Sequence, residues 1–324
     1  MRNKLGISFI VIGKNEGWKI SLCLQSIFDT ISYNGLTEYE VIYIDSASTD
    51  DTVKRALLFT NISIFQLNGL MNAAIARNTG AKLSTYETLF FIDGDMELVP
   101  KTLVVLYDEL TGLKSKFMSG NFENYFYSVS GEVTDKKKHY SLSEVTLMTT
   151  TGGLFLIEKN LWNSIGGMRN VFKKSQDLDL GLRLAKAGYK LRRVSEVLAI
   201  HHTVSYNRQD RLWDDVLRGN FLYHKALLYR KNILNKYAYK MMIREVSMFF
   251  LLFILILTFT TGNPIYLLIY PILIFVKMLY KRKKVQGRFW SLYLRYMVFD
   301  FGTILGFLFF WPSIKKPISY VRIT

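Results

Sequence analysis

Residues 89–95 read Leu-Phe-Phe-Ile-Asp-Gly-Asp, and this stretch decides the fold. Its four apolar residues are typical of a short buried strand, and the acid-glycine-acid triplet that follows indicates a tight turn where the strand ends. Outward from it, the patterns predict strands over residues 6–12, 40–44 and 62–66 and helices over residues 16–30, 50–59 and 71–82. Because strands alternate with helices, we predict an α/β fold with a mostly parallel sheet.

The chain beyond residue 100 is more mixed. Residues 114–150 are polar, and we expect the Lys136-Lys137-Lys138 run to lie in a solvated loop. The later patterns predict a strand over residues 154–157, a helix over about 177–187, a strand over 190–200 and a basic, aromatic-rich helical stretch over 205–245.

The net charge of +16 is unevenly distributed over the 324 residues. Residues 1–240 carry +7, whereas residues 241–324 carry +9 although they are the most apolar part of the chain. Basic flanks around apolar segments are typical of a membrane region rather than of nucleic-acid binding. We therefore predict a soluble domain over residues 1–240, a membrane region over residues 241–324, and no nucleic-acid partner. The single cysteine, Cys23, excludes an intrachain disulfide and a Cys-x-x-Cys site.

Almost every residue from 246 to 279 is apolar, with a break at Gly262-Asn263-Pro264. Each half is about 16 residues long, near the lower limit for a membrane span. We expect a hairpin over residues 246–280, because a hairpin places the basic residues at both of its ends on one side of the membrane. A third apolar segment over residues 296–312 is either a further span or an interfacial segment. The first apolar run is too short to predict a signal peptide.

Three aspartates lie where predicted strands end. In an open α/β sheet the ligand crevice lies at that edge. Asp93 and Asp95 can together hold one hard divalent cation, and Asp45 can accept a hydrogen bond from a nucleobase or a ribose. The structural alternative for each of them is a turn or helix-capping residue.

Two further features carry titratable groups. Asp177 opens a predicted helix, where the helix dipole favours its ionised form, and an ionised carboxylate can act as a general base. His201 and His202 follow the last predicted strand in a polar segment, and either could be a third metal ligand. Helix capping and structural hydrogen bonding remain the alternatives for these residues.

An ordered set of motifs resembles the family 2 inverting glycosyltransferases of the GT-A fold, over about residues 6–203. The motifs are Phe9-Ile10-Val11 with Asn15-Glu16, Asp45 with Ser48-Thr49-Asp50-Asp51-Thr52, Ala76-Arg77-Asn78-Thr79-Gly80, residues 89–95, Gly152-Gly153, Gly166-Gly167, and Asp177-x-Asp179-Leu180 with Arg183-Leu184 and Gly188-Tyr189.

The resemblance implies a role for each matching residue. Asp177 would be the catalytic base. Asp93 and Asp95 would bind the ribose and Mg²⁺ or Mn²⁺. The residues implied in nucleotide-sugar binding are Ile12, Asn15, Glu16, Asp45, Arg77, Asp93, Gly152 and Gly153.

The sequence departs from the family pattern at several positions. Ser46 and Ala47 replace the second Asp and the Gly of the usual Asp-Asp-Gly-Ser run, and Asn72 stands where Gly is frequent. Gln176 replaces the Glu before the base. The Arg and Trp in residues 208–213 are not adjacent as in processive synthases, which favours a non-processive enzyme.

The resemblance implies an inverting, metal-dependent glycosyltransferase, and the predicted membrane region indicates that it works at the cell membrane with its catalytic domain in the cytoplasm. It would transfer a sugar from a nucleotide-diphosphate sugar to a lipid-linked saccharide or a similar acceptor. Two alternatives remain open, sugar transfer to polyprenyl phosphate and a non-catalytic membrane scaffold that binds nucleotide sugars. A nucleotidyltransferase is disfavoured because the amino-terminal region lacks a glycine-rich phosphate loop with a basic residue.

Overall fold

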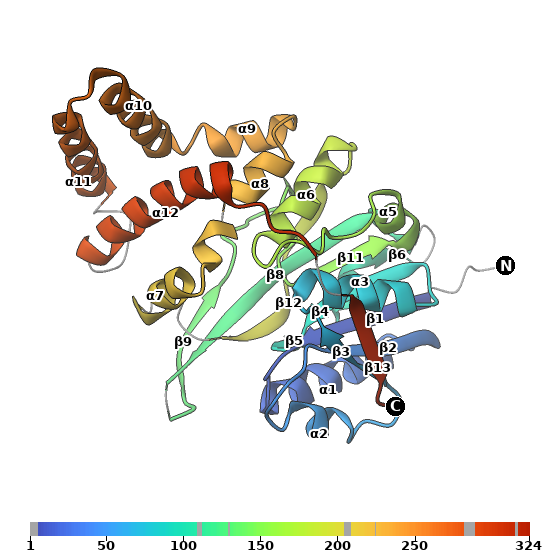
Figure 1. Ribbon diagram of the computed structural model, residues 1–324. Helices are drawn as coiled ribbons and strands as arrows, with labels where there is room; N and C mark the ends of the chain where they lie inside the picture. Colours follow the sequence, from blue (N-terminus) through green and yellow to red (C-terminus); the bar gives the residue numbers. More distant parts are fainter. Residues whose placement is uncertain are drawn as a thin grey trace. The chain divides into compact units, whose positions relative to one another are not determined.

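The computed structural model describes residues 6–108, 112–128, 130–203, 209–223, 225–281, 289–314 and 317–324. The chain forms two compact units, whose elements are labelled in Figure 1. The first comprises Met1–Ser205 together with Ile314–Thr324, and the second comprises Tyr206–Ser313. The second unit is thus an insertion between two segments of the first, and it begins before residue 240, where the sequence led us to expect a boundary.

The first unit alternates strands with helices in its amino-terminal part and becomes rich in strands later. Its strands are β1 (Gly6–Gly13), β2 (Glu38–Asp45), β3 (Ser63–Gly69), β4 (Thr88–Asp93), β5 (Met96–Leu98), β6 (Tyr107–Asp108), β7 (Gly112–Leu113), β8 (Phe117–Tyr127), β9 (Val133–Lys138), β10 (Thr146–Met148), β11 (Leu154–Glu158), β12 (Leu191–Thr203) and β13 (Ile318–Arg322). Its helices are α1 (Trp18–Tyr33), α2 (Thr52–Ala56), α3 (Ala73–Leu83), α4 (Thr102–Leu106), α5 (Lys159–Ser164) and α6 (Gln176–Lys186).

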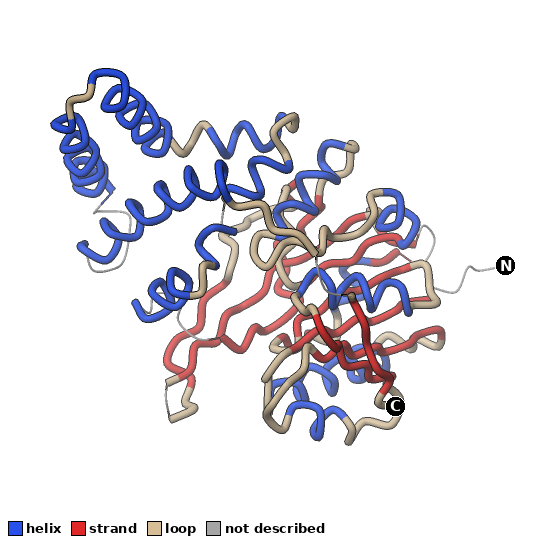
Figure 2. Tube along the Cα trace, viewed as in Figure 1, coloured by secondary structure: helices blue, strands red, loops and turns tan. Residues whose placement is uncertain are grey.

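Eleven strands form one mixed sheet, which runs through the first unit in red in Figure 2. The main order is β10-β12-β8-β11-β4-β1-β2-β3-β13, while β5 pairs with β12 and β9 pairs with β8. The pairs β1–β2, β1–β4, β2–β3 and β8–β12 are parallel, and the other pairs are antiparallel. The α/β class is confirmed, and the parallel arrangement that we expected holds for β1 to β4.

Apolar side chains of β1 pack alternately into two separate cores, one on each face of the sheet. Phe9 and Val11 pack in a cluster with Ile20 and Leu24 of α1. Ile10 belongs to a second cluster, which contains buried residues of α3, α5 and α6. Side chains of a strand point to opposite faces in turn, so a continuous apolar run indicates a strand covered on both faces. Helices therefore cover both faces of the sheet, as a doubly wound fold requires.

Two sequence-based expectations are wrong. The Lys136-Lys137-Lys138 run lies in strand β9, which pairs with β8, and not in a loop, although its side chains are exposed as expected. His201 and His202 lie within β12, not in a polar segment after it. In both places the pairing with β8 outweighs the polar composition that favoured a loop.

A strand from the carboxyl-terminal end of the chain closes one edge of the sheet. Strand β13 pairs antiparallel with β3, with Val321 opposite Gln66. The ladder continues beyond β13, since the backbone N–H of Ile323 donates to the carbonyl of Ile64 at 2.8 Å. An uncovered edge strand presents unpaired backbone groups to solvent, and β13 removes that exposure from β3.

The second unit is helical among its described residues. Its elements are α7 (Gln209–Leu217), the 3₁₀-helix η1 (Asn220–Tyr223), α8 (Ala226–Lys231), α9 (Lys236–Met242), α10 (Val246–Thr261), the 3₁₀-helix η2 (Pro264–Leu268), α11 (Ile269–Lys281) and α12 (Phe289–Phe309). Helices α10, α11 and α12 share an apolar cluster that includes Leu251, Ile274 and Ile304. Within this unit Asp300 is buried and accepts a hydrogen bond from the Tyr270 hydroxyl at 2.9 Å.

One helix in the described part of the chain, α12, is long and apolar enough to cross a membrane by itself, with a mean hydropathy of 1.4. Helices α9 and α10 pass the same test only together, and they are bent by 75° at their junction. The helical segment over residues 264–279 is shorter. The break expected at Gly262-Asn263-Pro264 does separate α10 from η2 and α11. The basic residues 282–284 and 315–316 lie outside the described residues.

We predict that Val321→Pro destabilises the first unit. Proline cannot donate to the β13–β3 ladder, and losing one backbone hydrogen bond at a sheet edge costs about 1–3 kcal/mol of unfolding free energy. Thermal unfolding of the purified chain should show a lower Tm for Val321→Pro. Val321→Thr is the control, because it keeps a strand-forming residue at this half-exposed position, and equal Tm values for the two variants would contradict the pairing.

Candidate active site

The parallel strands place three predicted site positions at one edge of the sheet. Gly13 at the end of β1 lies opposite Asp45 at the end of β2, and Ile12 lies opposite Asp93 at the end of β4. The backbone N–H of Gly94 donates to the carbonyl of Ile12 at 2.8 Å, so the Asp93-Gly94-Asp95 turn is fixed against β1. The edge on which we placed the ligand crevice is therefore where these strand ends meet.

A pocket of about 330 Å³ opens at this edge. It is lined by five of the residues singled out in the sequence, namely Ile12, Glu16, Arg77, Asp93 and Asp95. It is also lined by Gly13, Lys14, Ser46, Met71, Asn72, Ala73 and Gln176. Asn15, Asp45, Gly152, Gly153, Asp177, His201 and His202 do not line it. The pocket joins three carboxylates, those of Glu16, Asp93 and Asp95, to basic and amide groups, a combination suited to a polar, charged ligand.

An ion pair between Arg77 and Asp93 forms one wall of the pocket. Arg77, from α3, is 3% exposed and donates through Nη2 to Asp93 Oδ1. Its Nε is buried without a hydrogen-bond partner among the described residues. Burial raises the pKa of the Asp93 carboxyl, while the charge of Arg77 opposes this shift and that of Asp95 adds to it. Arg77 therefore stabilises a carboxylate beside the pocket and keeps a further N–H donor close to it.

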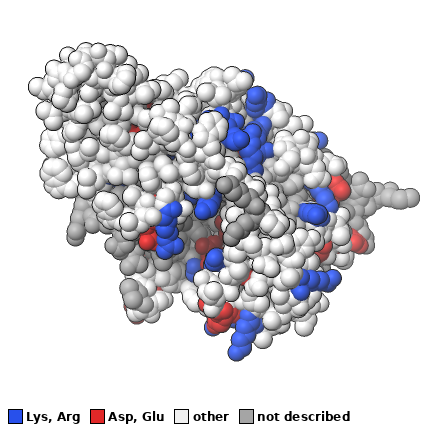
Figure 3. Space-filling view, in the orientation of Figure 1, with Lys and Arg blue, Asp and Glu red and all other residues white. Residues whose placement is uncertain are grey.

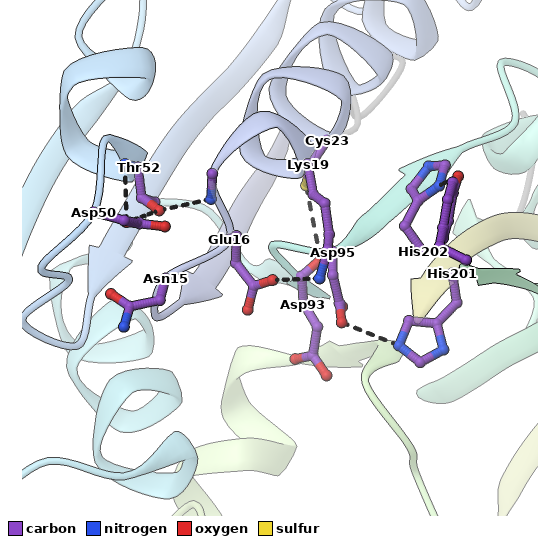
Figure 4. A network of polar contacts seen from close by, with 12 residues as sticks. Asn15, Glu16, Lys19, Cys23, Asp50, Thr52, Asp93, Asp95, His201 and His202 are labelled. Carbon is purple, nitrogen blue, oxygen red and sulfur yellow. Dashed lines mark hydrogen bonds and ion pairs between the residues drawn. The ribbon is translucent and has the colours of Figure 1, made fainter. Parts of the chain in front are cut away.

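Asp95 is joined to a histidine of β12. His201 Nε2 lies 3.1 Å from Asp95 Oδ2, a contact drawn as a dashed line in Figure 4. The other ring nitrogen of His201, Nδ1, lies 2.8 Å from Asn124 Oδ1. His202 takes a different partner, because its Nε2 lies 3.0 Å from Glu97 Oε2 and its Nδ1 lies 2.6 Å from the Tyr127 hydroxyl. Of the two histidines, only His201 contacts a carboxylate that lines the pocket.

Carboxylate oxygens suit Mg²⁺ or Mn²⁺, and an imidazole nitrogen beside them suits a transition metal such as Mn²⁺ better than Mg²⁺. Asp93, Asp95 and His201 supply these atoms here. Among the residues that the structure describes, no group of three His, Cys, Asp or Glu side chains is already placed to hold an ion. Asp93 and Asp95 remain one third and one fifth exposed, so their carboxylates are accessible to a cation that completes its ligands with substrate oxygens.

Glu16 and Asn15 act on neighbouring parts of the site. Glu16 faces Asp93 and Asp95 and pairs with Lys19 at 3.2 Å, and its burial together with the charge of Asp95 raises its pKa (Figure 4). Asn15 turns away from the pocket in a left-handed conformation, with φ of 56°. Its side-chain oxygen accepts from the Thr49 N–H at 2.8 Å, so Asn15 fixes the loop after β2.

Asp45 is fully buried beneath that loop. Its carboxylate accepts hydrogen bonds from the Tyr43 hydroxyl, from the Ser48 N–H and hydroxyl, and from the Gln66 amide, at 2.5 to 3.1 Å. Burial and the charge of Asp45 raise the pKa of Tyr43 well above its usual value. The structure therefore shows Asp45 organising the loop, while Ser46 is the loop residue that lines the pocket.

The two aspartates of α6 differ in their surroundings. Asp179 is fully buried and pairs with Arg169 at 2.7 Å and with Arg183 at 2.9 Å. Asp177 is partly exposed and accepts a hydrogen bond from the Thr150 hydroxyl at 3.1 Å. Asp179 thus stabilises the fold around the helix, and Asp177 is the carboxylate of this pair that can meet a substrate.

Segment 149–153 joins Asp177 to Asp93. At its end, a Cβ on Gly153 would overlap the Asp93 carboxylate, so only glycine allows this close approach. The Asp93 N–H also donates to the Gly153 carbonyl at 3.2 Å. The glycine pair in the sequence therefore brings the backbone of the segment against the strand end that carries Asp93.

Sequence reasoning missed several pocket residues. Lys14 and Met71 carried no motif signal. Asn72 and Gln176 were noted only as departures from a pattern, yet both line the pocket. Asn72 caps α3 by accepting from the Ile75 N–H at 2.9 Å, a role that its position before an Ala-rich helix could have indicated. The Gln176 side-chain oxygen is buried and has no hydrogen-bond partner among the described residues.

A comparison with protein-family sequence models finds a match to "Glycosyl transferase family 2" over residues 8–177. The chain belongs to glycosyl transferase family 2. The matched region runs from β1 to the first turn of α6 and includes Arg77, Asp93, Asp95 and Asp177. The resemblance on which the sequence analysis relied is therefore confirmed at the level of the family.

Two curated transferases are similar to this chain in sequence. The chain is 24% identical over 206 residues to Glycosyltransferase AglE of Haloferax volcanii, covering 60% of this chain and 66% of that protein. It is 30% identical over 106 residues to Poly(ribitol-phosphate) beta-N-acetylglucosaminyltransferase TarP of Staphylococcus aureus, covering 32% of each chain. The chain thus spans less than two thirds of the length of these relatives.

Among solved structures, the chain resembles that of GalNAc-T7 with UDP, GalNAc and Mn²⁺. The TM-score is 0.51 at 16% sequence identity, with 64% of this chain and 45% of that chain covered. At this identity the likeness concerns the fold, and it agrees with the mixed α/β sheet of this family 2 member.

We predict that Asp45→Asn lowers the unfolding free energy of this family 2 chain by about 1–3 kcal/mol. The new amide NH₂ group would face N–H and O–H groups that now donate hydrogen bonds to the buried carboxylate. Thermal unfolding measures the change. Asp51→Asn is the matched control, since Asp51 and Arg55 form a solvent-exposed ion pair. An exposed ion pair contributes less than about 1 kcal/mol to the free energy of unfolding. Equal losses in the two variants would contradict the role of Asp45.

Proposed function

We propose that this chain is an inverting glycosyltransferase that uses a nucleoside-diphosphate sugar. The observation that carries the proposal is the pocket at the ends of β1 and β4, where Arg77, Asp93 and Asp95 meet in a family 2 chain. Basic N–H groups suit the phosphate oxygens of the donor, and carboxylates suit its ribose hydroxyls and a bridging cation. Ile12, Asn15, Glu16 and Asp45 shape the nucleotide side of the pocket in this proposal.

In this proposal Asp93 and Asp95 hold Mg²⁺ or Mn²⁺, with His201 beside them. A divalent cation bound there would neutralise charge on the departing diphosphate. His202 is assigned no metal role, because its carboxylate partner is Glu97, which does not line the pocket, whereas the partner of His201 is Asp95, which does. Arg77 orients Asp93, and its positive charge at the pocket wall suits the phosphate groups of the donor.

We assign the role of general base to Asp177. Asp177 takes the proton of an acceptor hydroxyl as that oxygen bonds to the anomeric carbon, and the bond from this carbon to the diphosphate oxygen breaks. One displacement inverts the anomeric configuration, so a single base is sufficient. The partial exposure of Asp177 and its hydrogen bond from Thr150 support this assignment, as does the full pairing of Asp179.

The direct test of the function is a screen of nucleotide sugars against the purified chain with Mn²⁺ present. Binding is followed by thermal shift, and turnover is followed by nucleotide release with candidate acceptors. We expect one class of nucleotide sugar to raise the Tm and to be consumed. A screen in which no nucleotide or nucleotide sugar binds would contradict the proposal.

We predict that Asp177→Asn lowers turnover by about 100- to 10,000-fold, the usual contribution of a general base. Donor binding should change little, because Asp177 does not line the nucleotide pocket. Steady-state nucleotide release and donor titration measure the two effects. Asp135→Asn, on the exposed strand β9, should keep normal turnover. Near-normal turnover of Asp177→Asn would show that another group is the base.

We predict that turnover depends on a divalent cation bound through Asp95. EDTA should abolish nucleotide release, and added Mn²⁺ should restore it. Asp95→Ala should remove the effect of Mn²⁺ on UDP affinity, measured by calorimetric titration with and without the cation. The exposed Glu87→Ala serves as the charge-matched control. Full activity in chelator, or an unchanged Mn²⁺ effect in Asp95→Ala, would exclude the metal role.

We further propose that the second unit attaches the enzyme to the cytoplasmic side of the cell membrane. Large apolar side chains of α10 and α12 are exposed, with Phe253 at 61%, Phe259 at 90% and Phe309 at 76%. In Figure 3 the region of α10 and α11 is almost free of charged side chains. Exposed apolar faces of this extent are typical of segments in contact with lipid or with a partner.

A membrane location favours a lipid-linked saccharide as the acceptor, because tethering raises the effective concentration of an acceptor in the bilayer plane. Sugar transfer to polyprenyl phosphate is the alternative acceptor chemistry. Assays that offer a lipid phosphate and a lipid-diphosphate saccharide in parallel distinguish the two. The product formed identifies the acceptor class directly.

We predict that the full chain stays with membranes after washing with alkaline carbonate and is released by detergent. Alkaline carbonate removes peripheral proteins, whereas segments embedded in hydrocarbon resist it. Immunoblotting of pellet and supernatant measures the distribution. Complete release into the supernatant by carbonate would contradict membrane insertion.

A further inference from the structure

Arg193 is a fully buried arginine in β12 that the proposed mechanism does not use. Its Nη2 donates to the carbonyl oxygens of Thr150 and Thr151 at 3.0 and 2.9 Å. Its guanidinium carbon lies 3.8 Å from the centroid of the Tyr140 ring. Its Nε and Nη1 are buried without a hydrogen-bond partner among the described residues. This guanidinium is therefore held by two backbone carbonyls and one aromatic face.

The carbonyls that Arg193 binds belong to the segment that joins the two reactive parts of the site. Thr150 carries both a carbonyl bound by Arg193 and the hydroxyl that donates to Asp177. Three residues later, Gly153 lies against the Asp93 carboxylate. Arg193 thus contacts the segment midway between the proposed base and the proposed donor site.

Helix α6 fixes the same segment from the other side. A Cβ on Gly181 would overlap the carbonyl group of Thr149, so the helix that carries Asp177 packs directly on this backbone. Thr151, whose carbonyl Arg193 binds, is 1% exposed. The segment is held between Gly181 of α6 and Arg193 of β12, and a shift of the segment would move the partner of Asp177.

Arg193 also carries a buried positive charge. A buried cation without a carboxylate partner is costly, and folded proteins retain one where its charge has a use. Arg193 forms no ion pair with the described carboxylates, and the acidic groups that act on its charge are Tyr140 and, more weakly, Asp177. Burial lowers the pKa of Arg193, while Tyr140 and Asp177 oppose that shift. Tyr140 and Asp177 therefore favour the charged form of Arg193 in its buried position.

We propose that Arg193 is a positioning residue for the base, because it holds segment 149–153 through two carbonyls and thereby places the Thr150 hydroxyl that donates to Asp177. This inference rests on the proposed role of Asp177. Arg193 does not contact the substrate in this account. It acts on the rate of sugar transfer through Thr150 and Asp177, and it leaves the donor pocket unchanged because none of its atoms lines that pocket.

The test compares Arg193→Met, Arg193→Lys and the control Arg192→Met in the full-length chain. Methionine keeps much of the side-chain volume and removes the charge and the donors, whereas lysine keeps a charge and donors. Arg192 precedes Arg193 on β12 and contacts the Lys114 carbonyl at 3.2 Å, away from segment 149–153. The readouts are kcat, the donor KM, and the affinity for UDP with Mn²⁺ as the binding probe.

We expect Arg193→Met to lower kcat by about 100-fold, the effect of a reacting group displaced by about 1 Å, with donor KM and UDP affinity within about threefold of the parent. Arg193→Lys should recover at least about tenfold of that loss. The double variant Arg193→Met with Thr150→Val should lose much less than the product of the single losses, because both act through one segment.

Several results would overturn the inference. One is an unchanged kcat in Arg193→Met, and another is an equal loss of kcat and UDP affinity, which would indicate general damage to the fold. Multiplicative losses in the double variant would place the two residues in separate roles. If the parent chain turned over none of the donors and did not bind UDP, the proposed function would be rejected. If the parent chain were active and the Arg193 variants behaved like it, only the role of Arg193 would be rejected.

Discussion

The ion pair between Arg77 and Asp93 is the interaction on which the rest of the site depends. Arg77 is almost fully buried on α3, and its charge partner stands at the end of β4. Because Arg77 is buried, removal of Asp93 would leave its charge unpaired, so the ion pair favours one arrangement of helix and strand. The parallel register of β1 and β4 then places Ile12 beside Asp93, and the backbone at Gly153 rests against the same carboxylate. The pocket and the segment that reaches Asp177 are both positioned from this point.

The amino-terminal half of the fold was predictable because its information is local. Apolar runs that end in polar turns marked β1, β2 and β4, and parallel strands necessarily bring such ends to one edge. Asp93 and Asp95 were found in this way, since the acid-glycine-acid turn stands at the end of β4, whereas Arg77 of α3 was identified only through the resemblance to the family. The surroundings that separate Asp177 from Asp179 were not predictable, because Arg169 lies ten residues away from Asp179 in the sequence and only the fold brings them together.

Non-local pairing explains the expectations that were wrong or absent. The lysines of β9 and the histidines of β12 have a composition typical of loops, yet both segments pair with β8 and become strands. Strand β13 pairs with β3 across about 250 residues of chain, a distance at which no periodicity carries a signal. Asp45 illustrates the same limit within the site, because its position was predicted but its burial under four hydrogen bonds depends on Gln66 of another strand. Arg193 had no sequence motif and is recognised only from its two carbonyl contacts.

The central claim is that one base, Asp177, supports one displacement at the anomeric carbon. The measurement that tests it most directly is the anomeric configuration of the first-formed product, determined by proton NMR from the coupling constant of the anomeric hydrogen. With an α-linked nucleotide-sugar donor that the chain accepts, the account predicts a β-linked product. An α-linked product would show retention of the anomeric configuration and would contradict the single inverting displacement built on Asp177.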